Sequence, residues 1–347
     1  MNTKYRLFLI SLAVMAMCLT SQVTASAQEQ FSISEGLDNG QLKSTLEHNV
    51  NTFIAALTDA AERQQKKVKL NEDLFTAQAI DDVKAMWRNS PMSCPPVRIR
   101  SRCLNTSQGY QVRGIPIDIL NADEQNARQE LTIDFTPDGR ISNVSIAIEM
   151  HRYDKIMADN KSALDYARRQ KVVEFIENFR TAYNRKDLPY ISSVYSENAL
   201  IITGRVIKER PSSLDGKLIT MGNKVVYTQQ NKAEYIAKLK NIFKRNSYVN
   251  VRFEDIDVVE SRKYDNVYGV TLKQYWHTAP TAKSKGYSDV GYLFLIIDFT
   301  NSDDPLIQVR TWQPYLDDQG NIVTTPDEVY HLGMFKLPGD STKRQQP

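Results

Sequence analysis

Residues 172–204, VVEFIENFRTAYNRKDLPYISSVYSENALIITG, constrain the fold more than any other part of the chain. Four side chains recur at helical spacing and predict one buried helix face: Val172, Ile176, Phe179 and Tyr183. Pro189 suits the first turn of a second, shorter helix, and Ala199–Thr203 is predicted as a strand. This order of helix, helix and strand predicts an α+β domain whose helices cover one face of a sheet.

The residues that follow complete this predicted sheet. Residues 205–224 are a long polar excursion, after which Asn231 caps a helix with Glu234 in the capping-box position. The buried face of that helix is predicted to hold Ile236, Leu239 and Phe243. Four strands are then expected, at 249–253, 267–276, 287–299 and 306–312. The third of them is apolar on both faces, which is typical of a central, covered strand.

The region before residue 152 is predicted as a separate domain. Two helices are expected at Leu42–Ala60 and Leu74–Trp87, and four strands at 97–105, 110–120, 130–135 and 141–149. Pro, Asp and Gly within 136–140 predict a tight reversal between the last two strands. Residues 28–40 are expected to be a loose terminus, and the polar segment 152–166 is predicted to be a linker.

These elements predict the fold class α+β with two domains, at 28–151 and 167–340. Each domain is expected to pack its helices on a curved antiparallel sheet. The first is cystatin-like in the order of its elements, and a divergent tandem repeat is one interpretation of the pair. No repeat at the level of individual residues supports that interpretation.

The first 27 residues are predicted to be an export signal. Lys4 and Arg6 precede the apolar stretch Leu7–Thr20, and Ala25-Ser26-Ala27 forms a cleavage site before Gln28. We therefore expect a periplasmic or secreted protein. A lipid anchor on Cys18 is the alternative, although the bulky Met17 before it does not fit a lipobox.

Removal of that signal makes the chain nearly neutral. The signal contains two of the 44 basic residues and none of the 41 acidic ones, so 42 basic and 41 acidic residues remain. This balance predicts no general affinity for nucleic acid. No segment after the signal is apolar enough to predict a membrane span.

Two cysteines, Cys94 and Cys103, follow the predicted cleavage site. An oxidising compartment permits a disulfide between them. The predicted strand that connects them would separate their Cα atoms by more than the ~7 Å that a disulfide tolerates. We therefore expect free thiols rather than a bridge, and no zinc site, because no histidine or second cysteine pair lies near in sequence.

Four strings carry a resemblance to a known family: YTQQNKAEYIAKLKNIF, VYGVTLKQYW, GYLFLIIDF and VRTWQPY. Together with residues 172–204 they resemble the nuclear transport factor 2-like family, and in particular exported two-domain Bacteroidetes proteins of that label. The resemblance covers about residues 165–335 and the first domain only loosely. It implies a cone-shaped sheet with a pocket at its open end, and it carries no catalytic residue over to this chain.

The resemblance directs attention to six residues as ligand-binding candidates. They are Tyr183, Tyr195, Trp276, His277, Arg310 and Trp312. Arg310 and Trp312 are two apart on one predicted strand and share a face, with Leu306 and Gln308 on the same face. Arg310 either binds a carboxylate or phosphate beside Trp312, or pairs with an acidic neighbour while Trp312 fills the core.

Catalysis in related cones uses a pocket acid or base, which suggests a second use for some of these positions. His277 is either a general base or a solvent-facing residue at a strand end. Glu197 is either a pocket base or a loop residue. No residue is assigned a catalytic role, and no metal or cofactor is expected, since the chain contains no metal-binding spacing and no phosphate-binding loop.

A basic strand face in the first domain is a further candidate. Arg98, Arg100 and Arg102 alternate with Val97, Ile99 and Ser101. The arginines either bind an anionic glycan or lipid headgroup, or simply form the solvated face of the strand.

Two functions follow from these features. The first is a non-catalytic module that binds a small ligand or a partner protein in the cone. The second is an isomerase or dehydratase with a dispersed acid-base pair, for instance His277 with Glu197 or with Asp298. A homodimer formed through the sheet is a third expectation, because curved sheets of this family often pair face to face.

Overall fold

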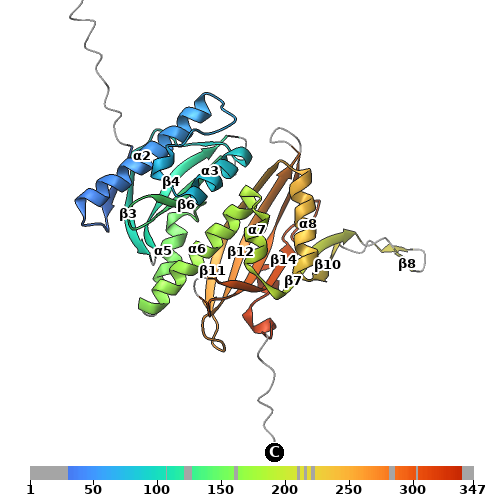
Figure 1. The fold of residues 1–347 in the computed structure, drawn as a ribbon. Helices are drawn as coiled ribbons and strands as arrows, with labels where there is room; N and C mark the ends of the chain where they lie inside the picture. Colours follow the sequence, from blue (N-terminus) through green and yellow to red (C-terminus); the bar gives the residue numbers. More distant parts are fainter. Residues whose placement is uncertain are drawn as a thin grey trace, which may run out of the picture.

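The computed structural model describes residues 30–106, 108–120, 127–159, 163–208, 212–214, 217–219, 223–280, 286–301 and 304–337. The predicted export signal, its cleavage site and Cys18 lie outside these residues. Among the described residues, no helix has the length and apolar composition to cross a membrane. The fold mixes helices with two large sheets (Figure 1).

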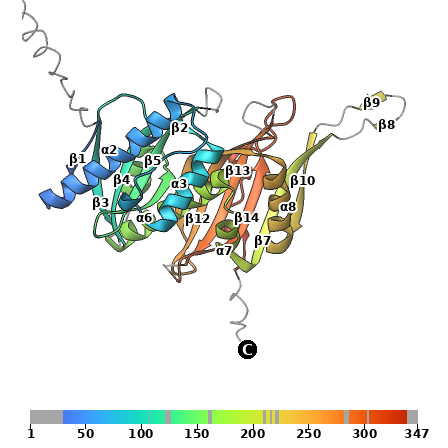
Figure 2. The same cartoon turned by 45° about the horizontal axis from the view of Figure 1, so that its top comes forward.

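The first sheet lies on the N-terminal side of the chain, in the order β1-β3-β4-β5-β6, with β2 paired to β4. Its strands are β1 (Phe31–Glu35), β2 (Met92–Ser93), β3 (Ile99–Thr106), β4 (Gly109–Ile119), β5 (Arg128–Phe135) and β6 (Ile141–Ile146). Helices α2 (Gly40–Glu62) and α3 (Ala77–Asn89) lie over this sheet, with the 3₁₀ turn η1 (Glu72–Leu74) between them (Figure 2). Strands β3 to β6 fall where four strands are predicted. The tight reversal is also confirmed, with Gly139 at φ +91° donating its N–H to the Thr136 carbonyl.

The start of this sheet differs from the prediction. Residues 28–40 are predicted to be loose, but β1 pairs in parallel with β3 and buries Phe31 and Ile33. The side chain of Asn51 on α2 accepts hydrogen bonds from the backbone N–H groups of Gln30 (3.0 Å) and Phe31 (2.9 Å). The strand has only five residues, which is too short for its alternation to stand out in a polar segment.

A long helix lies between the two sheets. Helix α6 (Ala163–Arg185) follows the short helix α5 (Met150–Ala158). The Thr181 hydroxyl accepts a hydrogen bond from the Ile146 N–H of β6 (2.9 Å), and the Asn184 side chain accepts one from the Val251 N–H of the second sheet (2.6 Å). Because α6 contacts both sheets, its buried surface extends around the helix and includes polar as well as apolar side chains.

The segment 152–166, predicted to be a linker, contains most of α5 and the beginning of α6. Tyr153, Ile156 and Met157 are buried there, at helical spacing within a charged sequence. The side chains around them are charged, which hides this short apolar pattern in the sequence.

The second sheet has the order β10-β7-β14-β13-β12-β11. Its strands are β7 (Tyr195–Lys208), β10 (Asn223–Gln230), β11 (Tyr248–Glu260), β12 (Val267–Ala279), β13 (Tyr287–Asp298) and β14 (Leu306–Pro314). Helices α7 (Leu188–Ser193) and α8 (Lys232–Arg245) pack beside it, and β8 (Ser212–Leu214) and β9 (Lys217–Ile219) form a separate hairpin. The predicted capping box of α8 is present, with Glu234 N–H donating to Asn231 Oδ1 at 2.9 Å.

Three features of the sheets differ from the prediction. Neither sheet is wholly antiparallel, because β1–β3 and β7–β14 are parallel pairs. Each of these pairs joins strands that are separated by long intervening segments, which leaves room for a parallel connection. Strand β10 lies partly inside the predicted polar excursion and continues to Gln230, and β7 is longer than the predicted strand at 199–203.

A β-bulge in β14 changes which side chains share a face. Ile296 and Ile297 of β13 pair with Val309 and Ile307, so Gln308 is the extra residue. As a result Ile307 joins Trp312 in the core beneath α6, whereas Gln308 lies beside Asp298. The predicted placement of Gln308 and Leu306 on the face of Arg310 is therefore wrong.

The chain beyond β14 covers part of the opposite face of the second sheet. It includes the 3₁₀ turns η2 (Pro326–Glu328) and η3 (Leu332–Met334). Phe335 stacks on Phe294 with ring centres 5.8 Å apart. A Cβ on Gly269 would lie 2.6 Å from the Leu332 side chain, so this approach requires glycine. A face-to-face homodimer would have to use the remainder of this face or displace the segment.

Candidate functional site

The core of the second sheet contains a buried arginine surrounded by aromatic side chains. Strand β14 directs Arg310 and Trp312 towards the helices, and both are buried. The Arg310 guanidinium carbon lies 5.0 Å from the centre of the Tyr235 ring on α8. The Tyr235 hydroxyl in turn shares a 2.6 Å hydrogen bond with the hydroxyl of Tyr183 on α6. We call Tyr183, Tyr195, Tyr235, Arg310 and Trp312 the arginine cluster.

Aromatic contacts fix the position of this cluster from several elements. Tyr183 meets Trp276 of β12 edge to face, with ring centres 5.7 Å apart. The ring centre of Tyr195, at the start of β7, lies 5.6 Å from that of Tyr235 and 6.1 Å from that of Phe179. The cluster is thus held by two helices and three strands, and the rings leave little freedom to its polar atoms.

The arginine cluster contains one positive charge, that of Arg310, and no negative charge that balances it. Within the described residues, no carboxylate forms an ion pair with Arg310. Burial raises the pKa of Tyr183 and of Tyr195 well above the ordinary range of tyrosine, so both hydroxyls stay neutral. Arg310 keeps its charge in proteins. Its Nε and the Nε1 of Trp312 are buried donors without an acceptor among the described residues.

Five of the six predicted ligand-binding residues come together in or beside this cluster. Tyr183, Tyr195, Arg310 and Trp312 belong to it, and Trp276 packs against Tyr183. The sixth, His277, lies on the other face of β12, because successive residues of a strand alternate. Its Nδ1 is 2.7 Å from the Ser288 hydroxyl, and its ring packs against Tyr248.

The two predicted acid-base pairs are not brought together. Glu197 is 86% exposed and pairs with Lys232 at 2.6 Å. Asp298 pairs in register with Val267, whereas His277 is ten positions farther along β12. At about 3.3 Å per residue, His277 and Asp298 lie roughly 33 Å apart along the strand.

Tyr235 is the member of the cluster that sequence reasoning missed. It precedes Ile236 on α8, one position outside the predicted apolar face. The face of a helix that packs on a core is wider than a narrow stripe, and a tyrosine at its border can place its ring over the core. That border position was the available signal.

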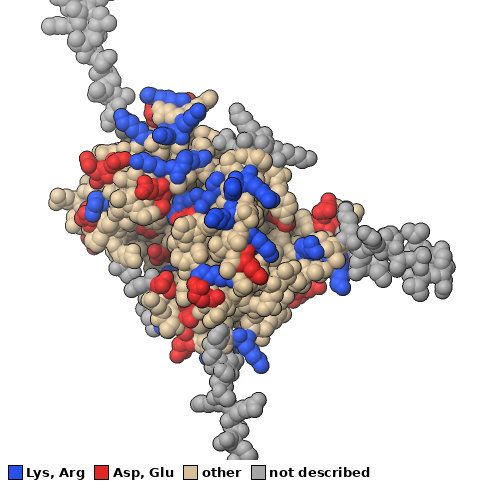
Figure 3. Space-filling model, turned by 45° about the vertical axis from the view of Figure 1, so that its right-hand side comes forward, with Lys and Arg blue, Asp and Glu red and all other residues tan. Residues whose placement is uncertain are grey.

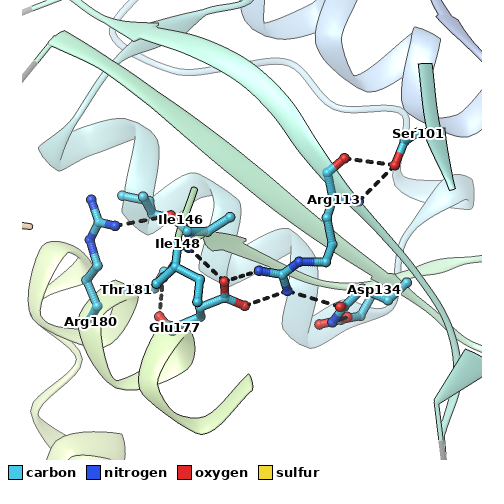
Figure 4. Close-up of polar contacts among 10 residues, drawn as sticks. Ser101, Arg113, Asp134, Ile146, Ile148, Glu177, Arg180 and Thr181 are labelled. Atoms are coloured by element: carbon cyan, nitrogen blue, oxygen red, sulfur yellow. Dashed lines mark hydrogen bonds and ion pairs between the residues drawn. The ribbon is translucent and has the colours of Figure 1, made fainter. Parts of the chain in front are cut away.

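A second polar cluster, also missed, lies where α6 meets the first sheet (Figure 4). Arg113 of β4 reaches Glu177 of α6 in a bidentate ion pair, with the Nη1–Oε2 distance 2.9 Å and both side chains at most 2% exposed. The Ile148 N–H also donates to Glu177, at 2.7 Å. The charges of this pair are therefore matched, unlike that of Arg310.

Arg180 extends this junction towards the second sheet. It donates to the Ala147 carbonyl (3.2 Å) and to the Val251 carbonyl of β11 (2.9 Å). Asn89 of α3 makes a similar link, since its amide oxygen accepts from the Val249 N–H (3.2 Å) and its amide nitrogen donates to the Val249 carbonyl (2.6 Å). No local sequence pattern indicates these roles, because isolated polar residues inside helices are usually exposed.

Two carboxyl groups near this junction have shifted pKa values. Burial, followed by the negative charges of Asp134 and Glu177, raises the pKa of Glu174 to about 7. Burial also raises the pKa of Asp134, although its oxygens accept hydrogen bonds from Gln111 (2.7 Å) and Asn143 (2.9 Å). These groups crowd negative charge beside Arg113, so a proton on Glu174 stabilises the junction.

The remaining sequence candidates lie away from the arginine cluster. Arg98 and Arg100 are exposed, and Arg102 pairs with Asp154 of α5. Cys94 and Cys103 are free and buried, and burial raises the pKa of Cys94 to about 11. In the described parts of the chain, no three His, Cys, Asp or Glu side chains gather in a way that could hold a metal ion.

Comparison of this chain with known proteins finds similar solved structures at low sequence identity. No protein-family model and no curated protein matches the chain. A nuclear transport factor 2-like protein of unknown function from Shewanella oneidensis is 16% identical, with 41% of this chain and 96% of that chain covered and a TM-score of 0.27.

Two other neighbours carry functional names. The β subunit of benzoate 1,2-dioxygenase from Burkholderia mallei is 13% identical, covers 47% of this chain and 99% of its own, and has a TM-score of 0.31. A candidate dehydratase of the nuclear transport factor 2-like family from Streptomyces avermitilis is 13% identical, covers 43% of this chain and 96% of its own, and has a TM-score of 0.30. The Streptomyces avermitilis and Shewanella oneidensis neighbours are described as nuclear transport factor 2-like, the family that the sequence resembles, and both match at low TM-scores over less than half of this chain.

Proposed function

We propose that this chain is an exported, non-catalytic binding module that takes a small organic anion in the cone of its second sheet. The observation that carries the proposal is Arg310, a buried guanidinium without a carboxylate partner among the described residues. A buried charge is costly unless it is paired. A ligand carboxylate would supply the missing charge and accept from the fork of guanidinium N–H groups.

The surroundings of Arg310 suit the remainder of such a ligand. Trp312 and Trp276 provide apolar walls, and the Trp312 Nε1 is a second donor without an acceptor among the described residues. The Tyr183 hydroxyl, whose pKa is raised by burial and which therefore keeps its proton at neutral pH, adds a polar contact, and the Tyr235 hydroxyl adds another. Apolar walls with a few fixed polar groups are the usual composition of a small-molecule site.

A ligand would reach Arg310 from the side of α8. Tyr235 covers the guanidinium, and its hydroxyl bonds Tyr183 across the cluster. An anion that displaces the Tyr235 ring would exchange one hydrogen bond and one cation–π contact for a charge-assisted pair with Arg310. The separation of His277 from Glu197 and Asp298 supports binding over acid-base catalysis.

The test compares carboxylates with their neutral amides. Thermal unfolding of the full chain would be followed with a panel of aromatic and aliphatic monocarboxylates, each matched to its amide, for instance phenylacetate against phenylacetamide. A ligand that binds only the folded state raises the melting temperature. We expect at least one carboxylate, and not its amide, to raise it.

Two variants locate the effect. Arg310→Met removes the charge and keeps much of the side-chain volume, and we expect it to abolish the shift. Arg262→Met removes an exposed positive charge elsewhere and should leave the shift unchanged. The proposal fails if amides act as well as carboxylates across the panel, or if the shift persists in Arg310→Met.

A further inference from the structure

Positive side chains from four separate segments meet on one face of the molecule, where helices of both halves of the chain end. A chain of contacts links these helix ends, and the first of them joins the segment after α2 to the end of α3. Trp87 Nε1 donates to the Gln65 carbonyl at 3.2 Å. This hydrogen bond holds the backbone at Gln65 against the last turn of α3. The exposed Lys66 and Lys67 directly follow Gln65, and Arg88 directly follows Trp87.

Two more contacts continue the series across the junction of the sheets. Lys186, just beyond α6, has a lowered pKa because of burial and the nearby charge of Arg88. Its Nζ donates to the Asn246 carbonyl at 3.3 Å. Asn246 follows Lys244 and Arg245 in the last turn of α8. We call Lys66, Lys67, Arg88, Lys186, Lys244 and Arg245 the basic band.

The charges of this band are not neutralised locally. Within the described residues none of the six side chains forms an ion pair with a carboxylate, whereas Arg185 beneath them pairs with both Asp82 and Asp187. Figure 3 shows Lys and Arg side chains gathered on one face, while Asp and Glu are more frequent elsewhere in the view. The whole chain is nearly neutral, with 44 basic and 41 acidic residues, so general basicity does not explain the gathering.

A cation at one helix C-terminus is an ordinary feature, because it complements the helix dipole. That explanation applies to Arg88, Lys244 and Arg245, which lie in last turns, but not to Lys66 and Lys67, which follow the end of α2. It also predicts no alignment among the residues. Here the ends of α2, α3, α6 and α8 converge, and Lys186 approaches Arg88 in spite of like-charge repulsion. A fixed row of positive charge is complementary to an extended polyanion.

We infer that the basic band is a binding surface for an anionic polysaccharide, with sulfate or carboxylate groups along its length. A membrane surface fits less well, because Val68, the apolar residue inside the lysine run, is buried and offers no anchor. Single-stranded nucleic acid fits less well too, because Trp87 is buried and the band has no exposed ring for base stacking. The exported location predicted from the sequence agrees with a glycan partner.

Heparin is a suitable probe of this surface. The full chain should bind heparin at low ionic strength, about 50 mM salt, with an affinity that falls steeply as salt is added. In the triple variant Lys67→Gln, Arg88→Gln, Arg245→Gln, we expect the dissociation constant to rise at least ~10-fold. The slope of log K against log salt should decrease by about 2 to 3, as counterion release predicts for three lost contacts.

A matched control removes the same charge elsewhere. Lys155, Arg262 and Lys336 are exposed outside the band, and their replacement by Gln should leave heparin binding within ~2-fold of the wild type. Circular dichroism and the melting temperature establish that both triple variants are folded. Three outcomes overturn the inference: no heparin binding by the wild type, equal loss in the control, or tighter binding to single-stranded DNA or to anionic lipid vesicles than to heparin.

Discussion

Two buried arginines in this chain differ in what neutralises them, and the difference separates structure from function. Arg113 faces Glu177 in a bidentate pair with both side chains buried. Arg310 faces tyrosine hydroxyls and rings. A paired buried charge stabilises the folded structure, since removing one partner leaves the other charged and unpaired in a low-dielectric interior. In the part of the chain that the structure describes, Arg180 has no carboxylate partner either, but its guanidinium donates to two backbone carbonyls. Arg310 has a buried Nε without an acceptor among the described residues, so its burial reduces stability unless a ligand completes the site.

Stability measurements on two matched substitutions distinguish these roles. Arg113→Met should lower the free energy of unfolding by about 3–5 kcal/mol, because Glu177 is left buried and unpaired. Arg310→Met should leave the free energy of unfolding unchanged or raise it, because no carboxylate is stranded. Urea denaturation of the ligand-free protein measures both.

The comparison has an internal control and a clear contrary result. Arg262→Met changes an exposed arginine and should alter stability by less than about 0.5 kcal/mol. If Arg310→Met is as destabilising as Arg113→Met, Arg310 is a structural residue and the proposed anion site loses its main support.

At the scale of elements, sequence periodicity located most helices and strands but not their contacts. The capping box of α8 and the turn at Gly139 follow local rules and are correctly predicted. The strand β1, the bulge in β14 and the position of Gln308 depend on partners distant in sequence, which periodicity cannot reveal. Alternation along β14 places Arg310 and Trp312 on one face, as predicted, while their role in ligand binding stays a prediction. Tyr235 is not predicted, because its contact with Arg310 depends on how α8 packs against the second sheet.

The Asn89 side chain connects helix α3 to strand β11, and no local sequence pattern indicates this contact. Its amide forms two hydrogen bonds with the backbone of Val249, as a neighbouring strand would, and so occupies part of the open edge of β11. Asn89→Ala leaves a buried donor and acceptor on β11, and we expect a loss of about 1–3 kcal/mol in unfolding free energy. Urea denaturation measures it.

The control for Asn89 lies on the same helix. Gln78→Ala removes an exposed amide that donates a hydrogen bond to Asp82 of α3, and should change stability by less than about 0.5 kcal/mol. A small effect of Asn89→Ala, equal to that of Gln78→Ala, would mean that water replaces the amide at the β11 edge.

At the scale of the whole molecule, α6 connects the two sheets. It carries Glu177 and Thr181 towards the first sheet and Tyr183 and Asn184 towards the second. Arg180 bonds backbone carbonyls on both sides. The stability of each half therefore depends on the same helix, and charge changes beside α6 should affect the molecule as a unit.

Glu174 on α6 provides the test, since its pKa is raised from 4.5 to about 7. A raised carboxyl pKa means that the folded state holds the proton more tightly than the unfolded state. The contribution of Glu174 is therefore most favourable below about pH 4.5 and is lost as the pH rises through about 7. We expect the wild type to lose up to about 1.4 kcal/mol per pH unit from this group over that window.

Glu174→Gln should remove this part of the pH dependence and raise the stability at pH 7.5 relative to wild type, because the neutral amide resembles the protonated acid. Urea denaturation between pH 5 and pH 7.5 gives the two slopes. Glu234→Gln, at the exposed cap of α8, controls for the general loss of a carboxylate. Parallel slopes for wild type and Glu174→Gln would mean that Glu174 is ionised in the folded protein throughout this range. The negative charge at the junction would then be stabilised by Arg113 and Lys171 rather than by a proton.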